Sequence, residues 1–464
     1  MKTHIRGAAK LAAFLLGFLM LIVLANRYLI MTDTFAALTM HEMKSRSDIE
    51  VAIIGSSIVR DHFNVDLIEE ETGLETFDAT IPTASLPASI ALLKELYRTN
   101  SPEWVVLVTE PYTFETVREA TEAQYKLLPY LSDFSNKAEY LLRNAREDGY
   151  YANRLFMFRR FGASSLKEIA KTIGMRHWPE ATYQRLLKTI DPSVSYMGSG
   201  FVRQASDKRP DDEIRERMQR EYTGYKYKLF KGSKQQLLEF KQLCEDNGSK
   251  LIVAISPNLT AHALAEPGFL DYNDSTMAFC LEQGIPCYNF SYARPELMPN
   301  LDRYYFDLYH MVGEGADIFS RAFARVFNAH MAGEDVSHLF HENRWQYADS
   351  IDFITNAWVH VYRGGMKWDK ASAHKKKEIE PLAAAQDIFL AECNKGTYVV
   401  PEYKFVLRNE DGSETILADY SEESLYACAP GELDGRTMRI YCRVKGEENA
   451  KEHWYDYTVP ASGA

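Results

Sequence analysis

The stretch Val51-Ala52-Ile53-Ile54-Gly55-Ser56-Ser57 decides the fold of this 464-residue chain. Residues 49–54 form a short, β-branched and almost entirely apolar run, which is typical of a strand buried on both faces of a parallel sheet. Gly55 lets the chain turn sharply where the strand ends. Ser57 then stands at the start of the next helix, where free backbone N–H groups and the helix dipole favour developing negative charge. The stretch therefore predicts an α/β sheet whose first strand delivers a serine to its end.

The alternation of strands and helices continues along the chain. Further buried strands are expected at residues 104–108, 251–255 and 285–288, and helices at 65–72, 85–97, 235–247, 277–283 and 315–330. The helix at 235–247 stops at Gly248, as a helix with a C-terminal glycine cap does. This pattern predicts an α/β domain over residues 49–330, with a parallel sheet covered on both faces.

Two long segments break the alternation. Residues 115–235 are rich in Tyr, Arg and Phe, and we expect a helical insertion that covers the ligand edge of the sheet. Residues 331–394 are expected to form a helical linker. Residues 395–460 alternate in polarity around the turn Asn409-Glu410-Asp411-Gly412, which predicts a small β-sandwich-like module. Such a module would bind a glycan or act as a spacer, and the sequence favours neither.

The N-terminus has the pattern of a membrane anchor. Lys2, His4, Arg6 and Lys10 precede residues 11–25, which contain no charge, and the apolar stretch approaches the roughly 20 residues that span a bilayer. We expect residues 1–30 to be an uncleaved signal-anchor helix rather than a removed signal peptide. The basic end stays in the cytoplasm, so the sequence predicts a single-pass protein of the cell membrane with its folded part outside the cytoplasm.

The composition argues against several classes of function. A net charge of -12 disfavours nucleic acid, whose binders neutralise phosphates with basic patches. The chain has no glycine-rich phosphate loop and no dinucleotide fingerprint, so we expect no cofactor. The six cysteines show no zinc spacing, and His338 and His341 are assigned to a helix end, so we expect no metal. In an exported protein some of the cysteines could be bridged, and Cys428 and Cys442, on adjacent candidate strands, are the first candidates for a pair.

The segment Asp307-Leu308-Tyr309-His310 supplies what a nucleophilic serine needs. A serine hydroxyl needs a base, and the base needs an orienting partner. Asp307 could hold the tautomer of His310 and raise its basicity, which would leave the other ring nitrogen for Ser57. Each part alone has a simpler reading, since Ser56 or Ser57 could merely cap a helix and Asp-x-x-His often does the same. Their order in an α/β frame favours a catalytic triad.

With these motifs in place, the chain resembles the SGNH (GDSL-type) hydrolase superfamily. Gly55-Ser56-Ser57 corresponds to its first block, with Ser57 as nucleophile, and the segment from Asp307 to His310 corresponds to its last. The N-terminal anchor, residues 79–85 and residues 106–114 look most like the membrane-anchored, DltD-like branch of cell-envelope acyl-transfer proteins. The resemblance implies a three-layer, flavodoxin-like parallel sheet over residues 49–330. It does not extend to the C-terminal module.

The resemblance also identifies a candidate oxyanion hole and its departures from the family. The backbone N–H groups of Ser57 and Thr83 would be the donors, although the second block of the family usually provides a glycine in the region of Thr83. The asparagine donor of the third block is absent, because Thr109-Glu110-Pro111 occupies that strand end. The loss of one such donor costs about 10²–10³ in rate. The DltD-like branch also lacks that asparagine.

The expected function is therefore an extracytoplasmic serine esterase or O-acyltransferase. Its substrates would be acyl or acetyl esters of a cell-envelope glycan or of a lipid-linked, teichoic-acid-type polymer, with a membrane-bound O-acyltransferase as a further partner. The alternatives are a non-catalytic envelope scaffold that partners such an enzyme, and a glycan-binding protein in which the C-terminal module is the working part.

Overall fold

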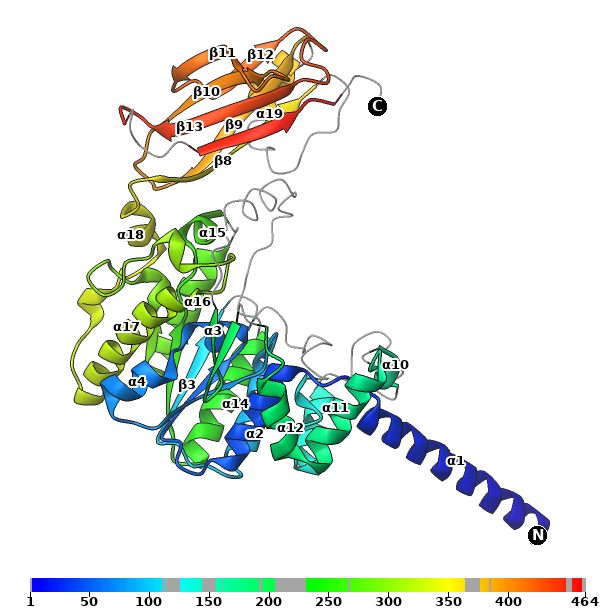
Figure 1. Ribbon diagram of the computed structural model, residues 1–464. Helices are drawn as coiled ribbons and strands as arrows, with labels where there is room; N and C mark the ends of the chain where they lie inside the picture. Colours follow the sequence, from blue (N-terminus) through cyan, green and yellow to red (C-terminus); the bar gives the residue numbers. More distant parts are fainter. Residues whose placement is uncertain are drawn as a thin grey trace.

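The computed structural model describes residues 2–110, 113, 126–143, 156–160, 162–191, 194–204, 231–265, 268–363, 376–383, 385–447 and 453–460. Its central sheet contains five parallel strands in the order β2-β1-β3-β6-β7 (Figure 1). They are β1 (Val51–Gly55), β2 (Thr76–Thr80), β3 (Trp104–Thr109), β6 (Lys250–Ile255) and β7 (Cys287–Asn289). This order is the flavodoxin-like one, in which ligands bind beyond the carboxyl ends of the strands where the order reverses. The predicted parallel sheet is confirmed, although β2 was not anticipated.

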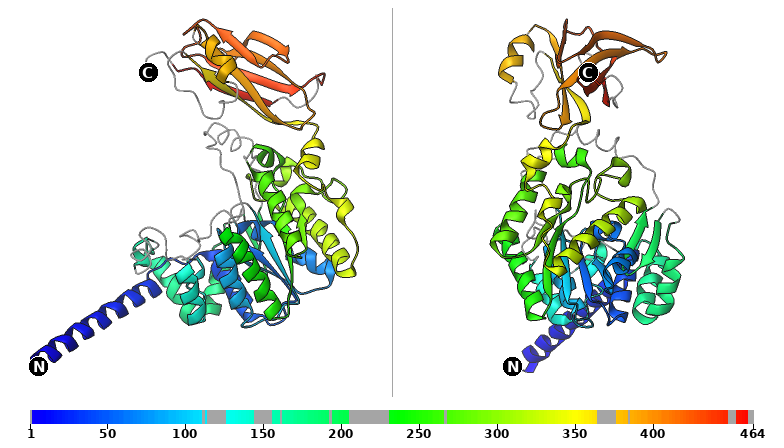
Figure 2. Two further views of the ribbon diagram at one scale, coloured as in Figure 1. Left: turned by 180° about the vertical axis from the view of Figure 1, so that it is seen from behind. Right: turned by 90° about the vertical axis from the view of Figure 1, so that its left-hand side faces the viewer.

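Helices cover both faces of this sheet (Figure 2). Ile53 packs with Phe63 and Phe319 on one face, whereas the neighbouring Ile54 packs with Leu93 and Phe240 on the other. Successive strand residues point to opposite faces, so β1 has to be apolar throughout. The first face carries α3 (Ser57–His62), α4 (Val65–Thr72) and α17 (Gly313–Ala332); the second carries α2 (Thr34–Ser45), α5 (Leu86–Leu96), α14 (Lys231–Asp246) and α16 (Phe269–Glu282). Shorter helical pieces are α15 (Thr260–Ala265), η1 (Phe290–Tyr292), η2 (Asp302–Tyr304) and η3 (Ser337–Leu339).

The segment between β3 and β6 is helical only in part. It contains α8 (Phe134–Arg143), α10 (Met157–Arg160), α11 (Leu166–His177) and α12 (Pro179–Leu187), as expected, and residues 114–125, 144–155 and 205–230 lie outside the described residues. The expectation is wrong for β4 (Val194–Gly198) and β5 (Phe201–Gln204), which form an antiparallel ribbon. A Cβ on Gly200, whose φ is +87°, would lie 2.0 Å from the backbone oxygen of Asp78. The glycine turn therefore lets the ribbon approach β2 at backbone distance.

The C-terminal region begins earlier than predicted. Residues 331–394 contain α18 (Arg344–Asp349) and α19 (Lys376–Ala383), but also β8 (Ile354–Tyr362) and β9 (Asp387–Lys395), so the helical-linker expectation is wrong there. One sheet has the order β12-β9-β8 and the other β11-β10-β13-β14, and they share one apolar core. The remaining strands are β10 (Pro401–Arg408), β11 (Glu414–Ser421), β12 (Leu425–Cys428), β13 (Thr437–Val444) and β14 (His453–Thr458). The sequence pattern did not show this boundary, because α19 lies between β8 and β9 in the sequence and makes the whole segment look helical.

The proposed Cys428–Cys442 disulfide is wrong. All six cysteines are free thiols. Cys428 ends β12 in one sheet, whereas Cys442 lies on β13 in the other. The two residues are therefore not on neighbouring strands, which was the premise of the pairing.

The N-terminal helix projects from the rest of the molecule. α1 (Lys2–Tyr28) contains a 22-residue stretch, Gly7–Tyr28, that has a mean hydropathy of 2.4 and is almost entirely unburied. It is long and apolar enough to cross a membrane. Figure 1 shows it extending away from the α/β domain as a single straight helix. The end of α1 is attached to the domain by bonds from Tyr28 to His177, 3.3 Å, and from the Phe158 N–H to Asn26, 3.2 Å.

Candidate active site

Ser57 is placed by the turn that ends β1. It is the first residue of α3, and Ser56 caps that helix by accepting a hydrogen bond from the Ile58 N–H. Gly55 has a packing role rather than a special backbone angle, because a Cβ there would lie 2.6 Å from Val59 Cγ2 and 3.2 Å from the Val108 oxygen. The glycine therefore allows α3 to fold tightly against the end of the sheet. This turn leaves the Ser57 side chain only partly buried.

Asp307 and His310 lie on a tight loop that the core holds in place. Tyr305 and Met311 form an antiparallel bridge, and the Phe306 N–H donates to the His310 oxygen at 3.1 Å. Leu308 is buried within the loop. The carboxylate of Asp307 fixes the loop internally, since its Oδ1 accepts the N–H groups of Tyr309 at 2.8 Å and His310 at 2.7 Å.

The structure brings the three predicted side chains together in one hydrogen-bonded chain. The distance from His310 Nδ1 to Asp307 Oδ2 is 2.8 Å, and that from His310 Nε2 to Ser57 Oγ is 2.9 Å. A carboxylate can only accept, so Nδ1 carries a proton and the neutral ring presents a bare Nε2 to the serine hydroxyl. The His310 side chain is 20% exposed and that of Asp307 is 25% exposed. The serine, base and orienting carboxylate are thus connected and remain within reach of solvent.

The charges around the triad strengthen the base. Burial disfavours a charged imidazole, but the hydrogen bond and charge of Asp307 outweigh it and raise the pKa of His310 above its usual value. Burial also acts against ionised Asp307, yet the bond to His310 and the two backbone donors lower the pKa of that carboxyl. Asp61 adds to the basicity of His310, and Arg60, which binds Asp61 through Nε at 2.7 Å, opposes it. The net result is a more basic imidazole paired with an ionised carboxylate.

His62 is a supporting residue that the sequence reasoning missed. Its Nε2 lies 2.8 Å from the Tyr309 oxygen and its Nδ1 lies 2.7 Å from Ser256 Oγ. The carbonyl can only accept, so Nε2 carries the proton and the Ser256 hydroxyl donates to Nδ1. Burial and the nearby His310 lower the pKa of His62 to about 3, which keeps the ring neutral. His62 therefore ties α3, which carries the nucleophile, to the loop that carries the base.

Glu110 is the second residue that sequence reasoning did not assign. It follows β3, and its Oε1 accepts a hydrogen bond from Ser56 Oγ at 2.5 Å. Burial raises the pKa of this carboxyl, while the bond to Ser56 and the charge of His310 act in the opposite direction. β1 and β3 are neighbours at the point where the strand order reverses. That position, at a strand end facing the serine turn, was the signal that could have identified Glu110.

Thr83, the second candidate oxyanion donor, lies in a turn beside the nucleophile. The Ile81 N–H donates to the Gly55 oxygen at 3.4 Å, and the Ala84 N–H closes the turn onto the Ile81 oxygen at 3.0 Å. Thr83 has a φ of 66°, in the left-handed region that β-branched residues avoid. With Pro82 before it, this is the position of a type II turn that glycine prefers. The second candidate oxyanion donor is thus also a residue under backbone strain.

The described part of the chain shows no group of three or more His, Cys, Asp or Glu residues that could hold a metal ion. His338 is exposed on η3, whereas His341 lies beyond this short helix and is buried. A cavity of about 570 Å³ lies between α1, α2 and α11, and no triad residue lines it.

Comparison with known proteins adds no assignment. No family model matches the chain. No curated protein matches it either. Among solved structures, an endo-β-1,4-mannanase from Thermotoga petrophila is similar at 11% identity, over 94% of this chain and 97% of that one, with a TM-score of 0.15. The function is therefore argued from the residues of this chain.

Proposed function

We propose that this protein is an extracytoplasmic, membrane-anchored serine esterase or O-acyltransferase of the SGNH type. The observation that carries the proposal is the continuous chain from Ser57 Oγ through His310 to Asp307, at 2.9 and 2.8 Å. Three side chains from segments about 250 residues apart meet in the order that nucleophilic catalysis needs. The flavodoxin-like strand order and the serine at the end of β1 support the same assignment.

The proposed reaction proceeds in two half-reactions. Ser57 Oγ attacks the carbonyl carbon of an ester while His310 Nε2 takes the hydroxyl proton. The backbone N–H groups of Ser57 and Thr83 would stabilise the resulting oxyanion. The intermediate then expels the alcohol, which receives the proton from His310, and leaves an acyl group on Ser57. Water or a glycan hydroxyl, deprotonated by His310, attacks this acyl-enzyme and frees the serine.

The proposed substrates follow from the membrane anchor and from the resemblance to the DltD-like branch. They are acyl or acetyl esters of a cell-envelope glycan or a teichoic-acid-type polymer, with a membrane-bound O-acyltransferase as partner. The long apolar α1 with basic residues at its start supports an anchored protein whose domain lies outside the cytoplasm.

The test is ester hydrolysis by the full-length protein in neutral detergent. We expect release of p-nitrophenol from p-nitrophenyl acetate, and loss of that activity in Ser57→Ala. Ser275→Ala is the matched control, because Ser275 lies on the exposed side of α16 and its hydroxyl bonds only the Asp271 oxygen among the described residues. Activity that survives Ser57→Ala would refute the assignment of the nucleophile.

A second candidate is a non-catalytic scaffold that uses the same site to bind an acylated partner. The observation in its favour is Glu110, a carboxylate at the strand end where the superfamily has an asparagine donor. An ionised carboxylate there would oppose an oxyanion. A fluorophosphonate probe distinguishes the two candidates, because an enzyme is labelled at Ser57 whereas a scaffold stays unmodified.

A further inference from the structure

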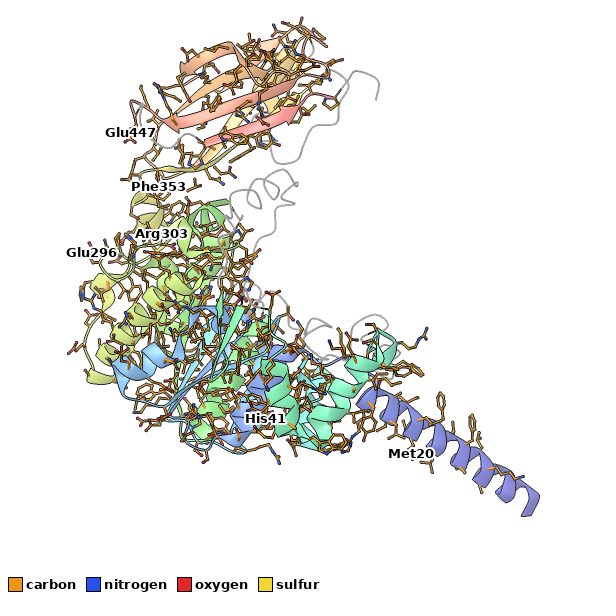
Figure 3. All side chains as sticks on the ribbon, in the orientation of Figure 1. Met20, His41, Glu296, Arg303, Phe353 and Glu447 are labelled. Atoms are coloured by element: carbon orange, nitrogen blue, oxygen red, sulfur yellow. The ribbon has the colours of Figure 1, made fainter. Side chains whose placement is uncertain are left out.

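A basic cavity lies where the membrane helix joins the folded domain. It has a volume of about 570 Å³ and is lined by residues of the end of α1, of α2, of α11 and of the segment 129–137. Figure 3 labels two residues that help to locate the cavity. His41, which lines it, lies on α2, and Met20 lies on the projecting part of α1. A cavity of this size is within the range of small-molecule and headgroup sites.

The lining of this cavity is strongly one-sided in charge. Among the described residues that line it there is no Asp or Glu, and five side chains are basic: Arg27, His41, Lys44, Lys137 and Arg176. The whole chain carries a net charge of -12. A concentration of positive charge in an acidic protein is therefore a local feature, and it requires a local explanation.

In the part of the chain that the structure describes, two of the five basic groups form an ion pair. Lys44 binds Glu95 at 2.9 Å, and His41 binds Glu180 at 3.0 Å. Within the described residues, Arg27, Lys137 and Arg176 form neither an ion pair nor a side-chain hydrogen bond, and Arg27 only stacks on Tyr28 at 5.6 Å.

The unpaired cations also destabilise one another. Burial first, and then the neighbouring Arg176, Lys44 and Arg27, lower the pKa of Lys137, and the charge of Glu95 opposes this shift without cancelling it. Burial and Arg27 likewise lower the pKa of Arg176. Lys137 and Arg176 are partly buried, whereas Arg27 is exposed at the rim. A partly buried charge without an ion-pair partner is costly, and a bound anion would lower that cost.

The described carboxylates near the cavity are already engaged by other groups. Glu95 is occupied by Lys44 and by the Ser132 N–H at 2.9 Å. Asp33 caps α2 by accepting the Ala36 N–H at 2.9 Å. The anion that the three cations lack would therefore come from outside the protein.

The position of the cavity identifies the source of that anion. Arg27 lies in the last turn of α1, at the end of the stretch Gly7–Tyr28 that is long enough to cross a membrane. The end of such a span lies at the level of the lipid headgroups. Apolar residues, among them Ile30 and Met31, line the cavity next to the cations. We propose that this cavity binds the phosphate group of an anionic membrane lipid through Arg27, Lys137 and Arg176.

The proposed site does not depend on the esterase assignment, because none of the triad residues lines it. Its function would be to fix the domain at a defined height and orientation on the membrane surface. The ion pairs to the lipid phosphate would add to the hydrophobic anchoring by α1. A lipid held at the junction would also fix the angle between helix and domain.

Binding can be measured on the full-length protein in neutral detergent by native mass spectrometry. The probes are dioctanoyl phosphatidylglycerol, dioctanoylglycerol, which has the same chains without phosphate, and inorganic phosphate. We expect saturable binding of the phospholipid and none of the diacylglycerol, with inorganic phosphate binding more weakly. Equal binding of inorganic phosphate would overturn the lipid assignment, and equal binding of diacylglycerol would overturn the role of the phosphate.

The cations are tested by the double variant Lys137→Met with Arg176→Gln. We expect binding about twenty-fivefold weaker, from roughly fivefold for each of the two cations removed near the membrane surface. The matched control is Lys167→Gln with Lys188→Gln, which removes the same charge from exposed positions on α11 and at the end of α12. The control should bind as the wild type does. Equal weakening in both variants would mean that only net charge matters, which refutes a built site.

A measurement on the wild type keeps the proposal testable if the double variant does not fold. Lys137 has a lowered pKa, so it should react readily with an amine acylating reagent at neutral pH. Phosphatidylglycerol should protect Lys137, while Lys167 remains reactive, and diacylglycerol should protect neither. Failure of the phospholipid to protect Lys137 would refute the site.

Discussion

The substitution Asp307→Asn tests the proposed role of the triad without disturbing the loop. Asp307 accepts three N–H groups, two from the backbone on Oδ1 and one from His310 on Oδ2. An asparagine can keep its oxygen on the two backbone donors, which places its NH₂ group opposite His310 Nδ1. Two donors cannot face each other, so Nδ1 must lose its proton and Nε2 must gain one. The ring then presents N–H rather than a lone pair to Ser57.

The expected loss is large in rate and small in stability. A base held in the wrong tautomer lowers kcat by about 10⁴-fold, the loss found when this carboxylate is neutralised in a serine protease triad. That factor corresponds to about 5.5 kcal/mol in the activation barrier. The backbone bonds of the loop remain, so the free energy of unfolding should fall by only about 1 kcal/mol, the net contribution of one hydrogen bond.

The assay combines p-nitrophenyl acetate hydrolysis, the rate of fluorophosphonate labelling and urea unfolding of the same preparations. Asp302→Asn is the control, since Asp302 is an exposed carboxylate in the segment just before the loop. The reasoning is refuted if Asp307→Asn retains activity within tenfold of the wild type. It is also refuted if the activity loss is matched by unfolding, because the loop would then depend on the charge.

Three further outcomes are expected. The rate of ester hydrolysis should rise with pH and level off above neutrality, because His310 acts as a base only when it is neutral. Asp307 raises the pKa of His310 above the usual 6.5. A pH–rate profile that is flat between pH 6 and 9 would contradict this. Thr83→Gly should raise the free energy of unfolding by about 0.5–1 kcal/mol, since relief of a positive φ exceeds the added chain entropy, and it should leave hydrolysis intact; a lower urea midpoint would contradict it. Glu110→Ala should cost about 1–3 kcal/mol because Ser56 loses its buried acceptor, whereas Glu110→Gln, which keeps an oxygen, should cost less; equal urea midpoints for the two variants would show that this bond is unimportant.

The sequence pattern predicted most of the parallel sheet but not its first edge strand. β1, β3 and β6 are short runs of mostly apolar residues, and such runs predict strands that are buried on both faces. β2 escaped because Thr76-Phe77-Asp78-Ala79-Thr80 has a carboxylate at its centre. Asp78 is completely buried, and burial raises its pKa well above the usual value. An isolated carboxyl of this kind is placed by the tertiary structure, because no local pattern favours it.

In the C-terminal module, too, the sequence pattern predicted only some of the strands. Strands β10 and β13 alternate in polarity and were predicted, whereas β8 and β9 pair with each other across intervening residues that read as helical. Pairing between strands far apart in the sequence depends on long-range contacts. The boundary of the module and the separation of Cys428 from Cys442 therefore followed only from the folded chain.

The sequence by itself determined the α/β domain, the apolar N-terminal helix and the identities of Ser57, Asp307 and His310. Hydrophobic periodicity and the chemistry of side chains are local properties, so they can be read before folding. Only the tertiary structure decided that the three residues meet at 2.9 and 2.8 Å, that His62 and Glu110 support them, and that a basic cavity lies beside α1. Distances between remote segments arise from packing around a shared core, and no local pattern contains them.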